Sequence, residues 1–443
     1  MRRAELRTDL TRPVAEEGTL ALDWFPADQR STVQSSGDLL RGLTPPAHAR
    51  DLLRVAVAAY TTDRISSRAR TQDGWTRELA LTIPVSGAVA WAAAKTPLVQ
   101  ALDFLSGDHW DLTFNEIDRA AGGARAGDLS ADAVCLFSGG LDSLSGAIDL
   151  LEEGNRVVLV GHYEGGLAPK RQAMLAAALQ SEYGDDKVEL RHLFLRAARP
   201  NRVQERPLPR ERENTMRARS LLFIAAGFAV ASSISPHVPL FIPENGYIGI
   251  NVPLTGSRPA SLSTRTTHPY FLDRLKATFD AIGLTNRLQN PYRLMTKGEM
   301  LAANRNPALL RRLAPNSLSC AHPETARFAK PKRPLGNCGY CYPCLIRRAG
   351  LHAIGQDTEN YAYDIAVEPG FLGTSQKGAS LRALIRSLAH RSSPHDVLRN
   401  GAIPNGETAQ FAEMYERGRA ELRRWLTAAG GDTIRARLGP PPS

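Results

Sequence analysis

The sequence of 443 residues contains few cysteines and no long hydrophobic run. Its longest apolar stretch, residues 221–231, is shorter than the roughly 18 residues of a membrane span, so we expect no membrane segment. The opening stretch MRRAELRTDL lacks the apolar core of a signal peptide, which predicts a cytoplasmic protein. Hydrophobic residues make up 43% of the chain and charged residues 23%, a balance typical of globular proteins with two or three domains.

Lysine is scarce, although the formal net charge is +10. A positive charge suits an anionic partner, but a strong bias toward arginine is more often a property of genomic base composition. The loop at residues 196–212 is rich in arginine and has no interleaved aromatic residues of the kind that stack on bases. We interpret this loop as a solvated face. The alternative is that it covers the phosphates of ATP or attracts an acidic partner. We do not expect a nucleic-acid partner.

A glycine turn follows an apolar, strand-like run at residues 133–137, where the sequence SGGLDS leads into a helical pattern. Glycines let the backbone approach an anion, and the N–H groups at a helix start attract negative charge. The stretch is neither a Walker A loop nor a Rossmann fingerprint. It predicts a phosphate-binding loop made of Ser138, Gly139, Gly140, Asp142 and Ser143, with Asp142 a candidate ligand of Mg²⁺ or a helix cap. A plain helix entry with incidental glycines is the alternative.

Four of the five cysteines lie close together, three of them spaced C-x2-C-x2-C in NCGYCYPCLIRR. In a cytoplasmic chain this clustering indicates a metal rather than disulfides. We predict a structural zinc site with the ligands Cys320, Cys338, Cys341 and Cys344. His322 is a substitute ligand or a neighbour, and an iron–sulfur cluster is the rival interpretation. Cys135, inside the apolar run, is predicted to be a core residue.

Strand and helix patterns alternate from residue 131, which predicts an α/β fold with a doubly wound parallel sheet. Its ligands are expected at the carboxyl ends of the strands, where SGGLDS lies. One of the covering helices is expected at residues 213–232. We divide the chain into three parts. Residues 1–128 form an N-terminal accessory domain, mixed α/β or β-rich, which ends in a linker at residues 120–130. Residues 131–350 form the core, with a zinc lobe at about 315–350, and residues 351–443 form a helical extension.

Two polar stretches follow the short strand expected at residues 240–242. Glu244 and Asn245 lie where ligands of such a sheet bind, and they are candidates for recognising a purine-like base, with a capped turn as the alternative. Arg265, in the stretch STRTTH, is a candidate clamp for a carboxylate or phosphate. The alternative for that stretch is a helix entry before Pro269.

SGGLDS resembles the loop of the ATP pyrophosphatase family, whose members adenylate an oxygen of the substrate, release pyrophosphate and then displace AMP with a nitrogen or sulfur nucleophile. Together with CGYCYPCLIR it resembles the QueC family, the 7-cyano-7-deazaguanine synthases. The resemblance covers roughly residues 131–350 and implies an adenine nucleotide alpha hydrolase type of fold, with ATP, Mg²⁺ and Zn²⁺ as cofactors. Three further stretches, MRARSLLFIAAG, TKGEML and GHYEGG, fit the family's pattern.

The resemblance implies roles for individual residues. Asp142, Ser143 and Lys297 would be catalytic, and Arg219 would join the loop in binding ATP. Tyr163 lies in an aromatic and glycine stretch that the family carries close to the nucleotide. The implied reaction is that of a carbon–nitrogen ligase, which adenylates a carboxylate, such as that of 7-carboxy-7-deazaguanine, with release of AMP and pyrophosphate, and forms an amide or nitrile.

The chain also departs from that pattern. Ser220 replaces the family's asparagine, the spacing from Cys320 to the other cysteines is longer, and residues 243–269 differ from the usual substrate loop. The added N- and C-terminal units are similar to the layout of the QatC type of QueC-like protein, found in antiphage defence operons with an ATPase, a partner protein and a TatD-like nuclease. This implies an amine acceptor on a protein partner. A tRNA-modifying enzyme and a catalytically degenerate nucleotide-binding adapter are the alternatives.

Overall fold

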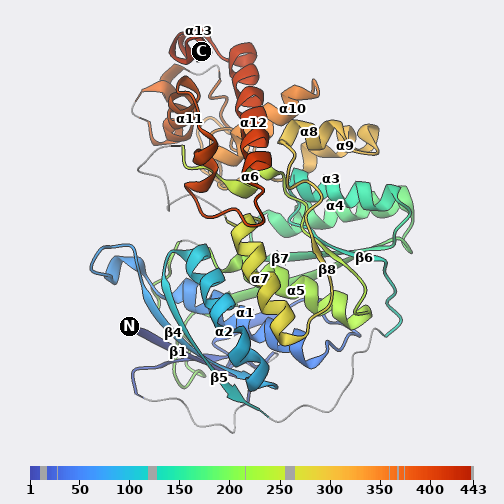
Figure 1. The fold of residues 1–443 in the computed structure, drawn as a ribbon, viewed down its shortest axis with the longest axis vertical. Coiled ribbons are helices and arrows are strands. Elements are labelled where there is room, and N and C mark those ends of the chain that lie inside the picture. Colours follow the sequence, from blue (N-terminus) through green and yellow to red (C-terminus); the bar gives the residue numbers. More distant parts are fainter. Residues whose placement is uncertain are drawn as a thin grey trace.

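The computed structural model describes residues 1–9, 17–26, 28–117, 127–214, 216–254, 265–358, 360–366, 369–373 and 375–440. Within these ranges the chain forms two β-sheets, helices that lie between and around them, and a helical C-terminal part (Figure 1). Most of the expected linker at residues 120–130 and part of the stretch at residues 243–269 lie outside the described residues.

The first sheet belongs to the N-terminal part and has the strand order β2-β1-β4-β5, with every pair parallel. Leu79, Leu81 and Ile83 alternate along one strand and are all buried, as their spacing predicts. A long, largely buried helix begins at Ala47, also as predicted. The elements are β1 (Arg2–Arg7), β2 (Leu20–Asp23), α1 (Ala47–Ile65), β4 (Glu78–Val85), α2 (Ala88–Ser106) and β5 (His109–Glu116).

The second sheet has the order β10-β9-β6-β7-β8-β3 and is parallel except for β3. This confirms the predicted parallel sheet. The chain runs outward from β6 through β7 to β8, and then returns to the other side of β6 as β9 and β10. The strands are β3 (Val33–Ser36), β6 (Ala133–Leu136), β7 (Val157–Tyr163), β8 (Val188–Ala197), β9 (Leu240–Phe241) and β10 (Leu288–Gln289).

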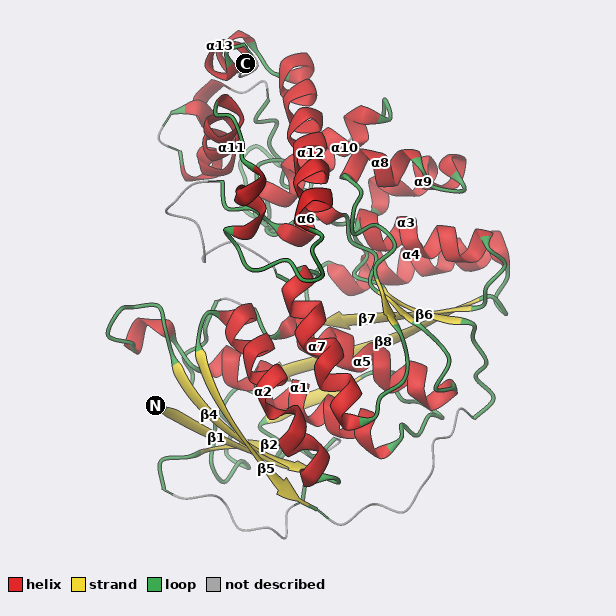
Figure 2. Cartoon of the chain, in the orientation of Figure 1, coloured by secondary structure: helices red, strands yellow, loops and turns green. Residues whose placement is uncertain are grey.

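Helices cover both faces of this second sheet (Figure 2). Ala133 and Cys135 pack into the core beneath one pair of helices, whereas Val134 and Leu136 pack into the core on the opposite face. Because both faces of this strand are buried, neither row of its side chains meets solvent, and residues 133–137 are continuously apolar. The helices are α3 (Leu141–Glu152) and α4 (Ala168–Tyr183) on one face, and α5 (Arg219–Ile234) and α7 (Pro269–Ile282) on the other.

The N-terminal part and the second sheet are joined. Strand β3, from the N-terminal part, pairs antiparallel with β8. One continuous core contains Leu52 and Leu79 of the N-terminal part together with Phe228 and Leu275 of α5 and α7. The predicted boundary near residue 128 therefore separates two sheets that share a strand and a core.

The helix predicted at residues 213–232 begins later, at Arg219. The preceding residues are held in an irregular conformation by bonds to α1 and to the turn after it. The Glu213 carboxylate accepts from the Arg68 backbone N–H at 3.0 Å, and the Ala218 N–H donates to Asp63 at 3.0 Å. These tertiary bonds satisfy groups that an earlier helical turn would otherwise use.

The C-terminal part is helical, as predicted, and it buries two apolar stripes, one within residues 381–388 and one within residues 411–425. Leu384 and Trp425, one from each stripe, are 0% exposed, so these stripes form a core rather than an open docking surface. No helix in the described ranges is long and apolar enough to cross a membrane. The remaining helices are α6 (Gly246–Ile250), α8 (Lys297–Ala302), α9 (Pro307–Leu313), α10 (Tyr342–Ala353), α11 (Ala379–Ala389), α12 (Thr408–Ala429) and α13 (Asp432–Leu438).

Candidate functional site

The SGGLDS loop lies where the strand order of the second sheet reverses. It follows β6, from which the chain continues to one side of the sheet through β7 and β8 before it returns to the other side of β6 as β9. Loops after the strands on either side of such a reversal turn away from each other and leave a crevice at the carboxyl ends. Ser138 to Ser143 and the segment after β9 meet at this position, as the sequence predicts.

The loop has the backbone that a phosphate site needs. Gly139 has φ +78°, and a Cβ atom there would lie 3.1 Å from Cγ of Gln172. Gly140, which has no side chain, is the N-cap of α3, so the helix start is left without a side-chain cap from this position. Two hydroxyls substitute, since the Gly140 N–H donates to Ser138 Oγ at 3.2 Å and the Leu141 N–H donates to Ser319 Oγ at 3.1 Å.

The two predicted serines differ in whether their hydroxyl groups could reach a bound ligand. Ser138 is exposed, whereas Ser143 is 3% exposed and its hydroxyl donates to the Gly140 carbonyl at 3.0 Å. Their oxygens lie 3.3 Å apart. Ser143 therefore closes the loop, and Ser138 presents its hydroxyl to the crevice.

Asp142 joins three separate segments. One carboxylate oxygen forms an ion pair with Lys297, and the other accepts from the backbone N–H and the side-chain amide of Asn245 at 3.1 and 2.7 Å. The side chains of Asp142 and Lys297 are 13% and 6% exposed. Both oxygens of Asp142 are thus engaged, so the carboxylate offers no unengaged oxygen to the predicted Mg²⁺.

Glu244 adjoins this cluster. Thr267 donates a hydrogen bond to its carboxylate, and the side-chain amide of Asn290 donates to its backbone carbonyl at 2.9 Å. Burial raises the pKa of Glu244 to about 7, with the nearby charge of Asp142 acting in the same direction and Lys297 opposing it. Glu244 therefore keeps its proton to a higher pH than an ordinary glutamate does, beside Asp142 and Lys297.

Three other predicted residues make contacts of their own. Arg219 donates from Nε to Nδ1 of His162 at 3.1 Å, and burial followed by the charge of Arg219 lowers the pKa of that imidazole to about 3. The Tyr163 ring packs edge-on to His192, with centroids 5.4 Å apart. Arg265 donates to the Phe104 carbonyl and to Asn400, and these two bonds connect α2 with the C-terminal part.

No pattern in the sequence placed the N-terminal part near the predicted site residues, yet α1 contacts one of the predicted stretches. The Tyr60 hydroxyl donates to Glu164 at 2.5 Å, and Arg64 forms an ion pair with the same carboxylate at 3.4 Å. Glu164 belongs to the GHYEGG stretch after β7. Glu164 was the sequence signal for this contact, as a charged residue within a glycine stretch. The sequence could not indicate its partners, because they lie about 100 residues away in the chain.

The four cysteines converge as predicted. Their sulfur atoms all lie within 4.8 Å of one another, and the closest pairs, Cys320–Cys341 and Cys338–Cys344, are 3.9 Å apart. Zinc–sulfur bonds of about 2.3 Å place the corners of a tetrahedron about 3.8 Å apart, so the group fits Zn²⁺. His322 is exposed and stacks on the Tyr340 ring, which makes it a neighbour.

The cluster holds its protons unequally. Hydrogen bonds from neighbouring thiols lower the pKa of Cys320 and raise those of Cys341 and Cys344, which favours a first thiolate at Cys320. Cys135, away from the cluster, is fully buried in β6, which confirms it as a core residue. Four thiolates would leave zinc no open coordination position, so a zinc ion bound here would be structural.

The metal lobe contacts the SGGLDS loop directly. The Leu318 N–H donates to the Gly139 carbonyl at 2.7 Å, and Ser319, which bonds to the Leu141 N–H, directly precedes Cys320. The buried Arg347 donates to Ser319 Oγ at 3.2 Å. Sequence reasoning overlooked Ser319, although its position beside a predicted metal ligand was a usable signal.

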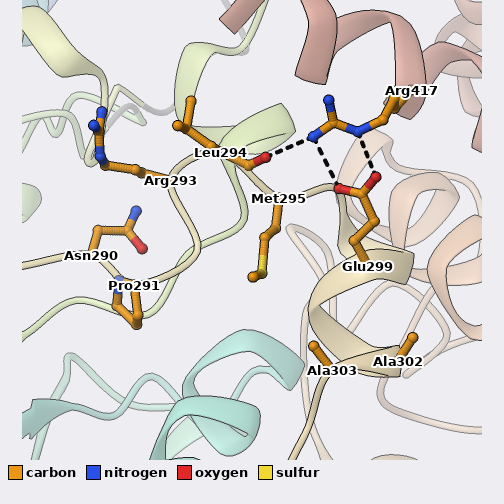
Figure 3. Close-up of a pocket in the computed structure, with 9 residues that line it drawn as sticks. All are labelled: Asn290, Pro291, Arg293, Leu294, Met295, Glu299, Ala302, Ala303 and Arg417. Atoms are coloured by element: carbon orange, nitrogen blue, oxygen red, sulfur yellow. Dashed lines mark hydrogen bonds and ion pairs between the residues drawn. The ribbon is translucent and has the colours of Figure 1, made fainter. Parts of the chain in front are cut away.

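A pocket of about 750 Å³ lies beside α8, and Figure 3 shows the side chains that line it. Arg417 crosses its edge, donating to Glu299 at 2.6 Å and to the Leu294 carbonyl at 2.9 Å. None of the predicted site residues is among its lining residues, which include Pro291, Met295 and Ala302. The predicted site residues therefore lie outside this pocket.

Comparison with known proteins gives no assignment: no family model, curated protein or solved structure matches the chain.

We expect the purified protein to contain one zinc per chain and no iron. Cys341→Ala should lose the metal, because three thiolates bind zinc less tightly, whereas Cys135→Ala should retain it. Elemental analysis measures both. Iron in stoichiometric amount, with absorbance in the visible range, would instead establish the iron–sulfur interpretation.

We expect Glu244→Gln to change how stability depends on pH. The raised pKa means that folded Glu244 holds its proton up to about pH 7, whereas the unfolded chain loses it near its ordinary, lower value. The wild type therefore loses stability as pH rises through this window. Glutamine resembles the protonated acid, so the melting temperature of the variant should rise relative to wild type between pH 5 and 8.

Glu299→Gln is the matched control, because its hydrogen bond to Arg417 lowers the pKa of Glu299 despite burial. The melting temperature of that variant should lie below that of wild type at neutral pH. At acidic pH, where Glu299 is protonated, the two melting temperatures should be equal. An unchanged difference between wild type and Glu244→Gln from pH 5 to 8 would contradict the raised pKa.

Proposed function

We propose that this chain is an ATP-dependent carbon–nitrogen ligase with the ATP pyrophosphatase type of fold. The observation that carries the proposal is the convergence, at the reversal of the sheet, of a glycine loop on a helix N-terminus with Asp142 and Lys297. An anion is favoured at that place by the helix dipole and by the lysine. The SGGLDS motif and the metal lobe that holds its loop support the same assignment.

In the proposed reaction an oxygen of a carboxylate substrate attacks the α-phosphorus of ATP. The bond from that phosphorus to the bridging oxygen of the β-phosphate breaks, and pyrophosphate leaves. A neutral amine then attacks the activated acyl carbon, AMP departs with the oxygen it gained, and the amine loses a proton. The loop N–H groups and Ser138 would bind the leaving pyrophosphate, and Lys297 would neutralise charge on it.

The acid we propose is 7-carboxy-7-deazaguanine or a close analogue, with Glu244 and Asn245 beside the reacting end. The acceptor we propose is an amine of a protein partner encoded in the same defence operon. Support comes from the resemblance of residues 131–350 to QueC enzymes and from the flanking parts, which a purely small-molecule reaction does not require. Mg²⁺ would arrive with the phosphates of ATP, because Asp142 is already engaged.

We expect Asp142→Ala to lower acid-dependent exchange of labelled pyrophosphate into ATP by about 100-fold or more, because it releases Lys297 and removes the link to Asn245. Asp142→Asn keeps the shape of the side chain and serves as a variant that folds. Asp132→Ala, at the opposite end of β6 and half exposed, should retain the wild-type rate. Wild-type exchange in Asp142→Ala would refute the catalytic role.

We expect the partner protein to gain mass when it is incubated with this chain, ATP and 7-carboxy-7-deazaguanine. The gain should equal the acid minus one water, since an amide bond forms. Intact-mass spectrometry measures it, and omission of ATP is the control. An unchanged partner together with free nitrile would refute the conjugation, and release of pyrophosphate would still support the ligase.

A further inference from the structure

The segment that carries Lys297 is held by the C-terminal extension. Glu421, on α12, accepts a hydrogen bond from Thr296 Oγ1 at 2.6 Å and another from the Gly298 backbone N–H at 2.9 Å. Both bonds end on the same carboxylate oxygen. Thr296 and Gly298 are the two neighbours of Lys297 in the chain, so one buried carboxylate binds the side chain before the lysine and the backbone N–H after it.

The helix start that carries the lysine depends on the same contact. Thr296 is the N-cap of α8, and its oxygen accepts from the Glu299 N–H at 3.1 Å in a capping box. A hydroxyl has a single proton, and here that proton goes to Glu421. Glu421 thus fixes the orientation of the cap, and with it the direction in which the first residue of α8, Lys297, leaves the helix.

Close packing leaves this segment no alternative position. A Cβ atom at Gly298 would lie 2.5 Å from Glu421 Oε2 and 2.7 Å from Cβ of Ala353. A Cβ atom at Gly350, on α10, would lie 2.2 Å from Cγ of Lys297. The start of α8 therefore lies against both α12 and α10, and the lysine side chain passes over a glycine on its way to Asp142.

We infer that Glu421 is a positioning residue for Lys297, so that the C-terminal extension completes the site that the SGGLDS loop begins. The inference rests on the proposed function only in the role given to Lys297. It assigns to α12 a task in the reaction centre, and it predicts that loss of the Glu421 contact lowers the rate through Lys297 and through no other group.

The test compares Glu421→Ala with Glu421→Gln in the full chain. The glutamine oxygen can accept both hydrogen bonds, so that variant should stay within about threefold of wild type in pyrophosphate exchange with 7-carboxy-7-deazaguanine. Glu421→Ala should lower kcat by about 10- to 100-fold with little change in KM for ATP, because a small displacement of a reacting group costs that much. Glu413→Ala, exposed on the same helix, is the matched control.

A double-mutant cycle separates positioning from general stability. If Glu421 acts through Lys297, Lys297→Ala together with Glu421→Ala should be no slower than Lys297→Ala alone. A double variant whose loss of rate is the product of the two single losses would overturn the inference. A wild-type rate in Glu421→Ala would overturn it as well. Equal losses in the alanine and glutamine variants would also overturn it, because the glutamine keeps the acceptor.

A second readout does not need the reaction. Lys297 is 5% exposed and ion-paired, so acetic anhydride should label it slowly in wild type. Mass spectrometry of the labelled peptides should show faster modification of Lys297 in Glu421→Ala than in Glu421→Gln, with Lys187 as an internal reference. If the wild type shows no pyrophosphate exchange, the proposed function fails, and the labelling alone decides whether Glu421 holds the lysine.

Discussion

The carboxylate of Asp142 is the constraint on which the site depends. It lies in the first turn of α3, pairs with Lys297 at the start of α8, and accepts two hydrogen bonds from Asn245 after β9. The free-energy cost of desolvating a largely buried lysine and carboxylate is offset only when the pair has good geometry and further hydrogen bonds. Asn245 donates these further bonds. The ion pair thereby fixes three segments at one edge of the sheet.

Asn245 connects this constraint to the fold around it. Its side-chain oxygen accepts from the Ile248 N–H at 3.1 Å and caps α6, while its amide group donates to Asp142. The segment after it is joined to the C-terminal core through Tyr247 and Ile250. The capped-turn and functional interpretations of Asn245 are therefore compatible, because one side chain does both.

Two buried arginines of the N-terminal part have a structural use. Arg68 and Arg77 share Asp108, and Arg77 also pairs with Asp63. Multidentate arginine pairs of this kind hold elements together with defined geometry. These two arginines are balanced by two aspartates, so the net charge of +10 is carried by other residues of the chain.

Local patterns explain which parts of the fold could be predicted from the sequence. The apolar run of β6, the glycine turn and the C-x2-C-x2-C spacing each specify their geometry within a few residues, and the structure has all three. The parallel direction of the strands followed from the alternation of strands and helices, whereas the antiparallel edge strand β3 was not predicted. The expected helix start near residue 213 was wrong because bonds to Arg68 and Asp63, far away in the chain, override local propensity there.

The flanking parts are where sequence reasoning had least to use, since their contacts with the site are all long-range. Tyr60 reaches Glu164 from the N-terminal part, and the C-terminal core packs against α6 and α10. The apolar stripes of the C-terminal part are buried in the core of this same chain. A protein partner of the proposed reaction would therefore bind outside those stripes, and the flanking parts also contribute contacts to the predicted site.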